Sequence, residues 1–202
     1  KDKGLAPKSR NNYFTIAKEY SKYLAKKSES GVSRWILYKG VSKAEKISER
    51  KTLDIKQLQK LYKYAVRLNK NASAQKQRDG LIVQLIACRG LRTIEVTRLK
   101  KNDLKKGFIY ILGKGKSKKI DLTLPSKLHR SIDKYSKTHD SDFLFPASNG
   151  GQLDTSLIRR MIKKAYKDAL NISDDSYNAH GFRHTLTQIL FNKGIPSDGL
   201  NG

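Results

Sequence analysis

The sequence has little sulfur and few prolines. Its 202 residues include one cysteine, one methionine, one tryptophan and four prolines. The single Cys88 cannot form an internal disulfide, and one cysteine with four scattered histidines does not make a structural zinc site. Cys88 lies next to Leu85, Ile86 and Ala87. It is therefore expected in the core, and the protein is expected in a reducing, intracellular location.

Long apolar segments are absent as well. No run of about 18 apolar residues occurs, so no membrane-spanning helix is expected. The first residues, Lys-Asp-Lys-Gly, lack the apolar core of a secretory signal. Internal repeats and low-complexity linkers are also missing. A folded protein outside the membrane is the expectation that remains.

Acidic residues are few, and positive charge dominates. The chain has 43 Lys and Arg against 18 Asp and Glu, for a net charge of +25. Nucleic acid is the leading candidate partner for such a charge, followed by an anionic membrane surface. The basic residues are interleaved with apolar periodicity, which indicates a folded protein with a basic surface rather than a charged tail.

The first fifty residues have their own pattern. Apolar residues at helical spacing predict a helix over residues 7–25, and a polar loop follows at 26–33. A short apolar patch at 35–38 precedes a charged, weakly patterned linker at 41–51. We expect a domain boundary there, with residues 1–45 in the first part and 46–202 in the second.

Helix signals begin after this linker. Asp54 and Gln57 form a capping-box pattern ahead of a helix that runs to about residue 69. A second helix over residues 74–89 ends at Gly90, in the position where a helix is commonly closed by glycine. A third is expected to begin with Thr93 as its N-cap and to bury Val96 and Leu99.

Two further helices are predicted at residues 126–137 and 154–170, and Asp154 is expected to cap the second. A short apolar connector, Phe143-Leu-Phe-Pro146, lies between them. The outer side of the second helix carries five basic residues, which form either a solvated surface or a track for phosphate: Arg159, Arg160, Lys163, Lys164 and Lys167.

Only residues 108–112 and 120–124 have convincing strand character. The turn between them, 113–119, is rich in glycine and lysine. Gly115-Lys116-Ser117 resembles part of a nucleotide-binding P-loop, but Tyr110 stands where that motif needs glycine, and a strand follows instead of a helix. We expect a cationic hairpin tip that contacts DNA phosphate. A solvated turn explains some of these lysines but not all of them.

Arg92 lies in the tight junction between two predicted buried helices. An Arg there is costly unless it has an anionic partner, either internal or bound. A salt bridge to Glu95 is the internal alternative.

His180, Arg183 and His184 occur within five positions, ahead of an apolar run that ends at Gly194. The run predicts a buried helix, and residues three and four apart share a helix face. Donors clustered at a helix start suit an anion. The alternative is a structural histidine with a surface arginine.

The order of these motifs resembles that of the tyrosine recombinase (phage integrase) family. The resemblance covers about residues 52 to 195, with Phe182 where the family commonly has leucine. It implies an α+β, mainly α-helical catalytic-domain fold with a small β-hairpin or sheet, after a helical remnant of a core-binding domain. The matching motifs are Gly90-Leu-Arg92-x-x-Glu95, Gly-Lys114-Gly in the hairpin, Phe143-Leu-Phe-Pro146 and His180-x-x-Arg183-His-Thr185.

By this resemblance Arg92, Lys114, His180 and Arg183 surround the scissile phosphate, with Lys116 as the alternative hairpin lysine. The implied activity is site-specific DNA recombination without metal or cofactor, through a 3′-phosphotyrosine intermediate. The implied partner is double-stranded DNA, on which the protein assembles as a tetramer. A cytoplasmic, DNA-associated location is expected.

The sequence departs from the family pattern at the nucleophile. Family members carry a catalytic tyrosine beyond the second arginine, but no tyrosine follows Arg183 here, and Tyr166 and Tyr177 precede the motif. We expect the chain to be a fragment, incomplete at both ends, that cannot complete strand cleavage. A type IB topoisomerase, a non-catalytic basic DNA-binding module and a basic ribosomal or RNA-binding protein remain as alternatives.

Overall fold

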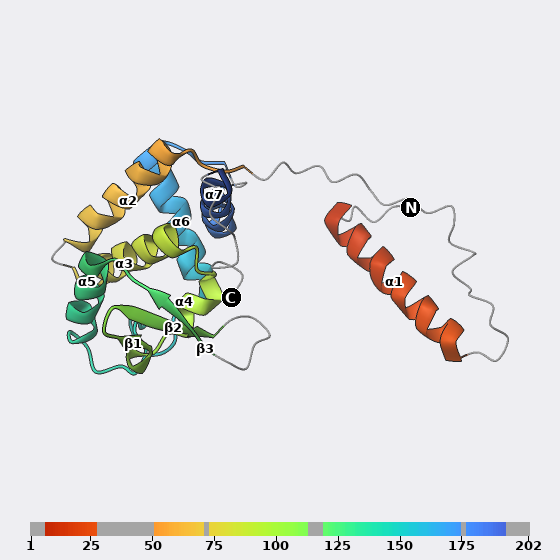
Figure 1. Cartoon of the computed structure of the whole chain (residues 1–202), viewed down its shortest axis with the longest axis horizontal. Coiled ribbons are helices and arrows are strands. Elements are labelled where there is room, and N and C mark those ends of the chain that lie inside the picture. The colour runs from red at the N-terminus through yellow and green to blue at the C-terminus, as the bar shows by residue number, and fades with distance from the viewer. Residues whose placement is uncertain (1–6, 28–50, 71–72, 113–118, 175–176, 193–202) are drawn as a thin grey trace. The chain divides into compact units, whose positions relative to one another are not determined.

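The computed structural model describes residues 7–27, 51–70, 73–112, 119–174 and 177–192 (Figure 1). The chain forms two compact units, residues 1–49 and 50–202. The first contains helix α1, Pro7–Lys27, which confirms the predicted helix and extends it by two residues into the expected loop. The predictions for residues 28–50 lie outside the described residues. The apolar side chains of α1 are exposed: Tyr13, Ile16, Tyr20, Tyr23 and Leu24.

The second unit begins with helices whose ends follow the local sequence signals. Helix α2 spans Ile55–Asn69 and starts with the predicted capping box. Asp54 Oδ1 accepts from the Gln57 N–H at 2.7 Å, and Gln57 Oε1 accepts from the Asp54 N–H at 3.0 Å. Helix α3 spans Ala74–Arg89 and ends at Gly90, whose φ of 64° is in the left-handed region that favours glycine.

Helix α3 is the centre of the unit (Figure 1). Residues 80–87 are all buried, and the helix packs against α2, α5, α6 and α7. Leu81, Ile82, Leu85 and Ile86 are fully buried, as their spacing predicts. Because neighbours surround α3, its ends are held in fixed positions, and the candidate site begins at its C-terminal end.

Helix α4 is a short one, Thr93–Thr97. The prediction of Thr93 as its N-cap is wrong, because Arg92 occupies that position and Thr93 is the first helical residue. The capping acceptor comes instead from Glu95, whose carboxylate receives the Arg92 N–H. Val96 and Leu99 are buried as predicted.

The described residues of the unit form one small antiparallel sheet with strand order β1-β2-β3. Strands β2, Phe108–Leu112, and β3, Lys119–Thr123, pair with Ile109 opposite Leu122. The strand β1, Leu104–Lys105, was not predicted, since two residues are too short for a periodic signal. A 3-10 turn, η2 (Lys101–Asp103), precedes it. The mainly helical α+β architecture is confirmed.

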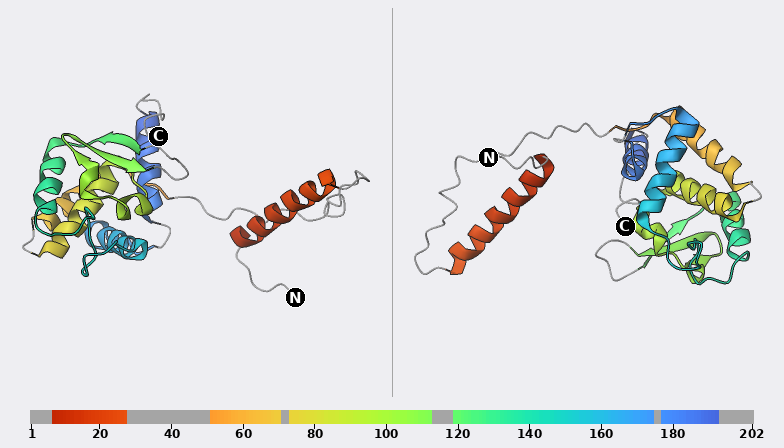
Figure 2. Two further views of the ribbon diagram at one scale, coloured as in Figure 1. Left: turned by 90° about the horizontal axis from the view of Figure 1, so that it is seen from below. Right: turned by 180° about the vertical axis from the view of Figure 1, so that it is seen from behind.

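Three helices complete the unit. Helix α5 spans Ser126–Ser136, α6 spans Thr155–Leu170 and α7 spans Ala179–Asn192. Asp154 caps α6 as predicted by accepting from the Ser156 N–H at 2.5 Å. The views in Figures 1 and 2 agree that α5 and α7 lie on opposite sides of the unit.

The prediction of a buried apolar run in α7 is only partly right. Gly181, Phe182 and Thr185 are buried, but Phe191 is 74% exposed and Leu186 is half-buried. The buried residues of α7 thus lie before the predicted run, in the N-terminal half of the helix, whereas Ile189 and Leu190 are half-buried like Leu186. Gly194, the expected end of the helix, lies outside the described residues.

The Phe143–Pro146 connector is a core element. Leu144 and Phe145 are fully buried, and the Leu144 N–H donates to the Leu99 carbonyl at 2.8 Å. The buried guanidinium of Arg78 donates to the Pro146 carbonyl at 2.7 Å. This segment therefore fixes the end of α4 against the start of α3.

Gly80 lies at the crossing of α2 and α3. A Cβ on Gly80 would lie 2.6 Å from both the Ala65 carbonyl oxygen and the Asn69 nitrogen. Replacing glycine by alanine inside a helix normally stabilises it by about 1 kcal/mol. Here we expect Gly80→Ala to lower the free energy of unfolding by about 1–3 kcal/mol, because two backbones must separate. Urea denaturation measures the difference.

Lys76→Ala, on the exposed side of α3, is the control and should change the unfolding free energy by less than about 0.5 kcal/mol. Equal stability of Gly80→Ala and the parent chain would contradict the packing described for α2 and α3.

Candidate active site

The site is built where α7 crosses the turn between α3 and α4. A Cβ on Gly90 would lie 3.3 Å from Leu186 Cδ1 and 3.5 Å from Arg183 Cα. Gly90 also has a positive φ, which disfavours a side chain at this position. This close approach brings Arg183 next to the segment that carries Arg92.

Arg92 is held by Glu95 through two hydrogen bonds. The Arg92 backbone N–H donates to Glu95 Oε2 at 2.8 Å, and its Nη1 donates to Oε1 at 2.7 Å. The Glu95 side chain is 3% exposed and the Arg92 side chain 38%. The internal salt bridge considered from the sequence is therefore present. It orients the guanidinium and leaves part of it open to solvent.

Arg183 reaches back over the same turn. Its Nη1 donates to the Gly90 carbonyl at 3.4 Å. Burial, followed by the positive charge of Arg92, lowers the pKa of the Arg183 guanidinium, and Glu95 opposes this shift. An arginine stays protonated at neutral pH despite such a shift. The positive charges of Arg92 and Arg183 therefore repel one another, and a bound anion would reduce this repulsion.

The first two turns of α7 carry the two histidines. The rings of His180 and His184 are in edge-to-face contact, with centroids 4.4 Å apart. Asn178, just before the helix, accepts at its Oδ1 from the His180 N–H at 2.9 Å and the Gly181 N–H at 3.3 Å. Asn178 therefore caps α7 and sets where the helix starts, which fixes the position of His180. This cap was missed in the sequence, although Asn is a common N-cap residue.

Arg92, His180 and Arg183 line one open pocket of about 650 Å³. Its walls come from residues 90–94, from Thr155 and Arg159 of α6, and from the start of α7. The structure thus brings together three of the four candidate residues. Lys114 and the alternative Lys116 lie outside the described residues. Arg159, noted in the sequence only as part of a basic helix face, adds a third arginine to the pocket.

The pocket is suited to an anion. Its lining in the described part of the chain has three arginines and a histidine, and no Asp or Glu. Two guanidinium groups offer planar forks of donors that match phosphate oxygens. Across the described residues, no group of three or more His, Cys, Asp or Glu is arranged to hold a metal ion. No helix among them is both long and apolar enough to span a membrane.

Neither of the tyrosines closest in sequence to the His-x-x-Arg motif lines the pocket. Tyr166 is fully buried against Phe182, with ring centroids 5.2 Å apart, and its hydroxyl donates to the Asn178 carbonyl at 3.4 Å. Burial, with a smaller effect of Tyr177, raises the pKa of Tyr166. Tyr166 is thus a core residue that supports the start of α7.

Residues 51–53, which precede α2, are held against α7 and the segment before it by hydrogen bonds and an ion pair. The Leu53 N–H donates to Thr185 Oγ1 at 2.9 Å, and both groups are buried. Lys51 forms an ion pair with Asp174 at 2.5 Å and lies over the Tyr177 ring. Thr185 is thus a structural partner two residues after Arg183, which the local sequence pattern did not indicate. Its partner lies 132 positions away.

The Arg92–Glu95 ion pair should contribute to the stability of the fold. Glu95→Gln keeps the volume of the side chain but removes the charge beside Arg92. Because Glu95 is buried and Arg92 is only partly exposed, we expect a loss of about 1–3 kcal/mol in the free energy of unfolding. Thermal and urea denaturation measure it.

Glu19→Gln in α1 is the matched control, since Glu19 and Lys22 form an ion pair with the same spacing at the surface. That substitution should leave the unfolding free energy unchanged. Equal effects of the two substitutions would show that Glu95 does not hold Arg92.

Comparison with known proteins places this chain in a family. Residues 51–201 match the model of the phage integrase family. Over 125 residues the chain is 27% identical to the tyrosine recombinase XerC of Caldanaerobacter subterraneus subsp. tengcongensis, and over 127 residues it is 31% identical to the tyrosine recombinase XerA of Pyrococcus furiosus. These matches cover 59% of this chain, and 35% and 43% of the respective relatives.

Solved structures agree on the fold. The XerH site-specific recombinase in a post-cleavage complex matches 98% of this chain and 61% of that protein, with a TM-score of 0.78 and 20% identity. A lambda integrase tetramer bound to a Holliday junction matches 96% of this chain and 57% of that protein, with a TM-score of 0.68 and 14% identity. The chain has the fold expected from its motifs, and it belongs to the phage integrase family of tyrosine recombinases.

Proposed function

We propose that this chain acts in site-specific DNA recombination, as the phosphate-binding part of a tyrosine recombinase. The observation that carries the proposal is the meeting of Arg92, His180 and Arg183 in one pocket, although the chain separates the two arginines by about ninety positions. Two arginine forks on one anion are suited to a phosphodiester, whose non-bridging oxygens gain negative charge when a hydroxyl attacks.

Each residue has a proposed part in strand cleavage. Arg92 and Arg183 bind the non-bridging oxygens and stabilise the charge that develops there, which needs no metal ion. His180 holds or exchanges a proton near the attacking hydroxyl. Lys114, or Lys116, protonates the leaving 5′-oxygen. The attacking group is a tyrosine, and it forms the covalent 3′-phosphotyrosine bond as the 5′-oxygen leaves.

The proposed partner is double-stranded DNA. Two of the similar structures are described as XerH bound to a difH substrate and lambda integrase as a tetramer on a Holliday junction. By analogy we propose that this protein also assembles on DNA as a tetramer, in the cytoplasm where DNA is available. Helix α1 is proposed to be the last helix of a core-binding domain.

Helix α6 supports a DNA partner. Its five basic residues are all exposed, as the sequence predicted, and Arg159 extends from this face into the pocket. A duplex that follows the basic face is thereby led to Arg92 and Arg183. Such contacts fix the position of the duplex but carry no sequence preference.

The proposed function predicts how DNA binding depends on salt. We expect the affinity of the 202-residue chain for duplex DNA to fall steeply with salt, with a log–log slope near −0.9 for each phosphate neutralised. Replacing Arg159, Lys163 and Lys167 by Gln should make the slope shallower by about 2–3. Fluorescence anisotropy over a salt series measures this. An affinity that does not change with salt, or that is higher for folded RNA than for duplex DNA, would instead indicate a ribosomal type of protein.

The proposed function also predicts which residues are needed for strand cleavage. On a nicked suicide substrate, a form of this protein that includes a nucleophilic tyrosine should form a covalent DNA adduct that survives a denaturing gel. Arg92→Ala or Arg183→Ala should reduce the adduct by at least about 100-fold and weaken binding only modestly, because charge stabilisation is needed mainly in the transition state. Arg98→Ala is the control: Arg98 is exposed and does not line the pocket.

An unchanged adduct in Arg92→Ala would contradict the assigned role. Joining the cut strand to a second duplex would identify a recombinase, whereas relaxation of supercoils alone would identify a topoisomerase.

The 202-residue chain itself should bind DNA without forming an adduct. Tyr166 is buried and hydrogen-bonded, and no tyrosine lines the described pocket. Binding and chemistry depend on different atoms, so the arginines still hold phosphate without a nucleophile. A covalent band from the 202-residue chain, lost on Tyr166→Phe or Tyr177→Phe, would contradict this.

A further inference from the structure

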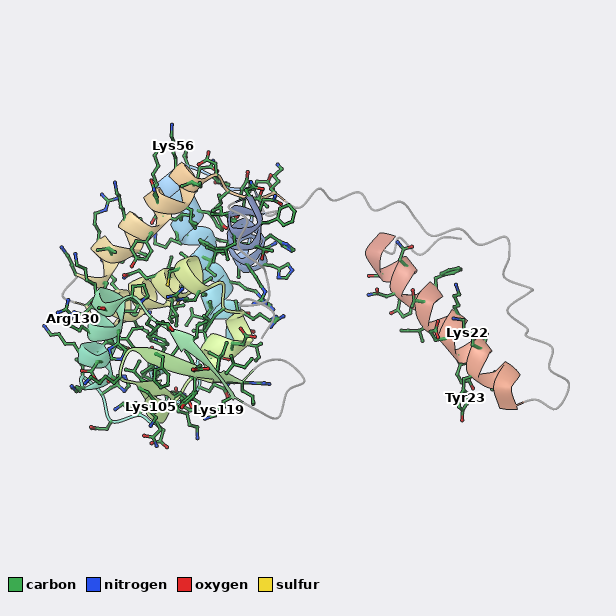
Figure 3. The ribbon with its side chains drawn as sticks, viewed as in Figure 1. Lys22, Tyr23, Lys56, Lys105, Lys119 and Arg130 are labelled. Atoms are coloured by element: carbon green, nitrogen blue, oxygen red, sulfur yellow. The ribbon has the colours of Figure 1, made fainter. Side chains whose placement is uncertain are left out.

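A second concentration of positive charge lies away from the pocket, on α2 and α5. The C-terminal end of α2 and the whole of α5 lie on the side of the unit away from α7 (Figures 1 and 2). Figure 3 shows Arg130 on this side. Seven exposed cations make up what we call the distal basic face: Lys60, Lys63 and Arg67 on α2, Lys70 at its C-cap, and Lys127, Arg130 and Lys134 on α5.

The spacing of these residues places them in two rows. On α2 they follow intervals of three, four and three, and on α5 intervals of three and four. Residues at such intervals share one face of a helix. From Lys60 to Lys70 the row extends for about 15 Å along α2, at about 1.5 Å per residue. The charge is therefore arranged as an elongated stripe.

Within the described part of the chain, the stripe has no paired counter-charge. None of its seven residues forms an ion pair with another described residue. Other exposed lysines of the chain do have acidic partners, for example Lys137 with Asp133 and Lys164 with Asp168. Like charges three and four apart on a helix repel one another. An arrangement that lowers stability in this way is suited to an external anion.

The surface is hollowed on both sides of α2. Between α2 and α5 a groove of about 630 Å³ is lined by Lys70, Lys127, Arg130 and Lys134. A second groove of about 640 Å³ is lined by Lys60, Lys63 and Arg67, and the two share Tyr62 and Val66. Among the described residues, neither groove is lined by Asp or Glu.

Neutral donors accompany the cations in the first groove. The Asn69 amide, the Ser131 hydroxyl and the Tyr62 hydroxyl all line it. Burial raises the pKa of Tyr62, so its hydroxyl remains protonated and able to donate. Cations with interspersed hydroxyl and amide donors are the groups that proteins use on DNA phosphates.

We propose that the distal basic face binds the phosphate backbone of a second DNA duplex, separate from the duplex at the Arg92–Arg183 pocket. A duplex presents about one negative charge per 1.7 Å of its axis, and an extended row of cations matches such a repeated charge better than a single phosphate. The binding has no sequence preference, because it uses no base edges. It requires no catalysis at the pocket. One protein molecule would then hold two duplexes near each other.

A capture assay tests this proposal. A biotinylated duplex on a surface is saturated with the 202-residue protein and washed, and a labelled second duplex of unrelated sequence is added. The distal variant Lys127→Gln, Arg130→Gln, Lys134→Gln should load on the first duplex within about two-fold of the parent chain. Its capture of the second duplex should fall by at least about 10-fold, because three phosphate contacts are lost.

Two further variants make the result specific. Lys76→Gln, Lys105→Gln, Lys106→Gln removes the same charge from exposed positions outside the distal basic face and should capture like the parent chain. Lys127→Arg with Lys134→Arg keeps the charge and should also capture normally. Every variant should melt at or above the temperature of the parent chain, since no packed contact is removed.

The proposal is overturned if the distal variant captures as much second duplex as the parent chain, because the bridging then comes from pockets of associated molecules. It is also overturned if the loaded parent chain captures no second duplex, and binding of poly-glutamate at this face would then indicate an acidic protein partner. Failure of the proposed function looks different, since the parent chain would then not load on the first duplex.

Discussion

The close approach of α7 to the turn at Gly90 is the contact on which the candidate site depends. The backbone of Arg183 lies directly over a glycine in the left-handed region, and its guanidinium returns to the carbonyl of that glycine. Helix α7 packs against α3 and against this turn at its C-terminal end. Arg92 and Arg183 share a pocket as a consequence, and their mutual repulsion prepares it for an anion.

The few acidic residues of the chain have particular places. Glu95 is buried beside Arg92, and the buried carboxylate of Asp103 pairs with Lys119 at the base of the hairpin and accepts from the Lys100 N–H at 2.9 Å. Asp54 and Asp154 begin helices. Acids thus orient individual cations or cap helices, while the distal basic face forms no ion pair with another described residue. The net charge of +25 is therefore concentrated in surface cations that have few acidic neighbours.

Local signals in the sequence predicted local structure well. The Asp54 capping box and the closing Gly90 are set by hydrogen bonds and backbone angles within a few residues, and both are confirmed. Thr93 was misassigned because a carboxylate three residues after Arg92 supplies the cap. Contacts between distant segments, such as Gly90 with Arg183 or Leu53 with Thr185, leave no periodic signal. Only the order of motifs pointed to a shared site, and the exposure of Phe191 had no local sign at all.

The central claim is that Arg92 and Arg183 act together on one tetrahedral anion. Anomalous diffraction from crystals of the 202-residue chain soaked in tungstate, which has the shape and charge of a phosphoryl group, tests it most directly. The account predicts one ordered tungsten site in the pocket, with its oxygens within hydrogen-bonding distance, about 2.7–3.2 Å, of both guanidinium groups. Tungstate bound to one arginine alone, or ordered elsewhere with the pocket empty, would contradict it.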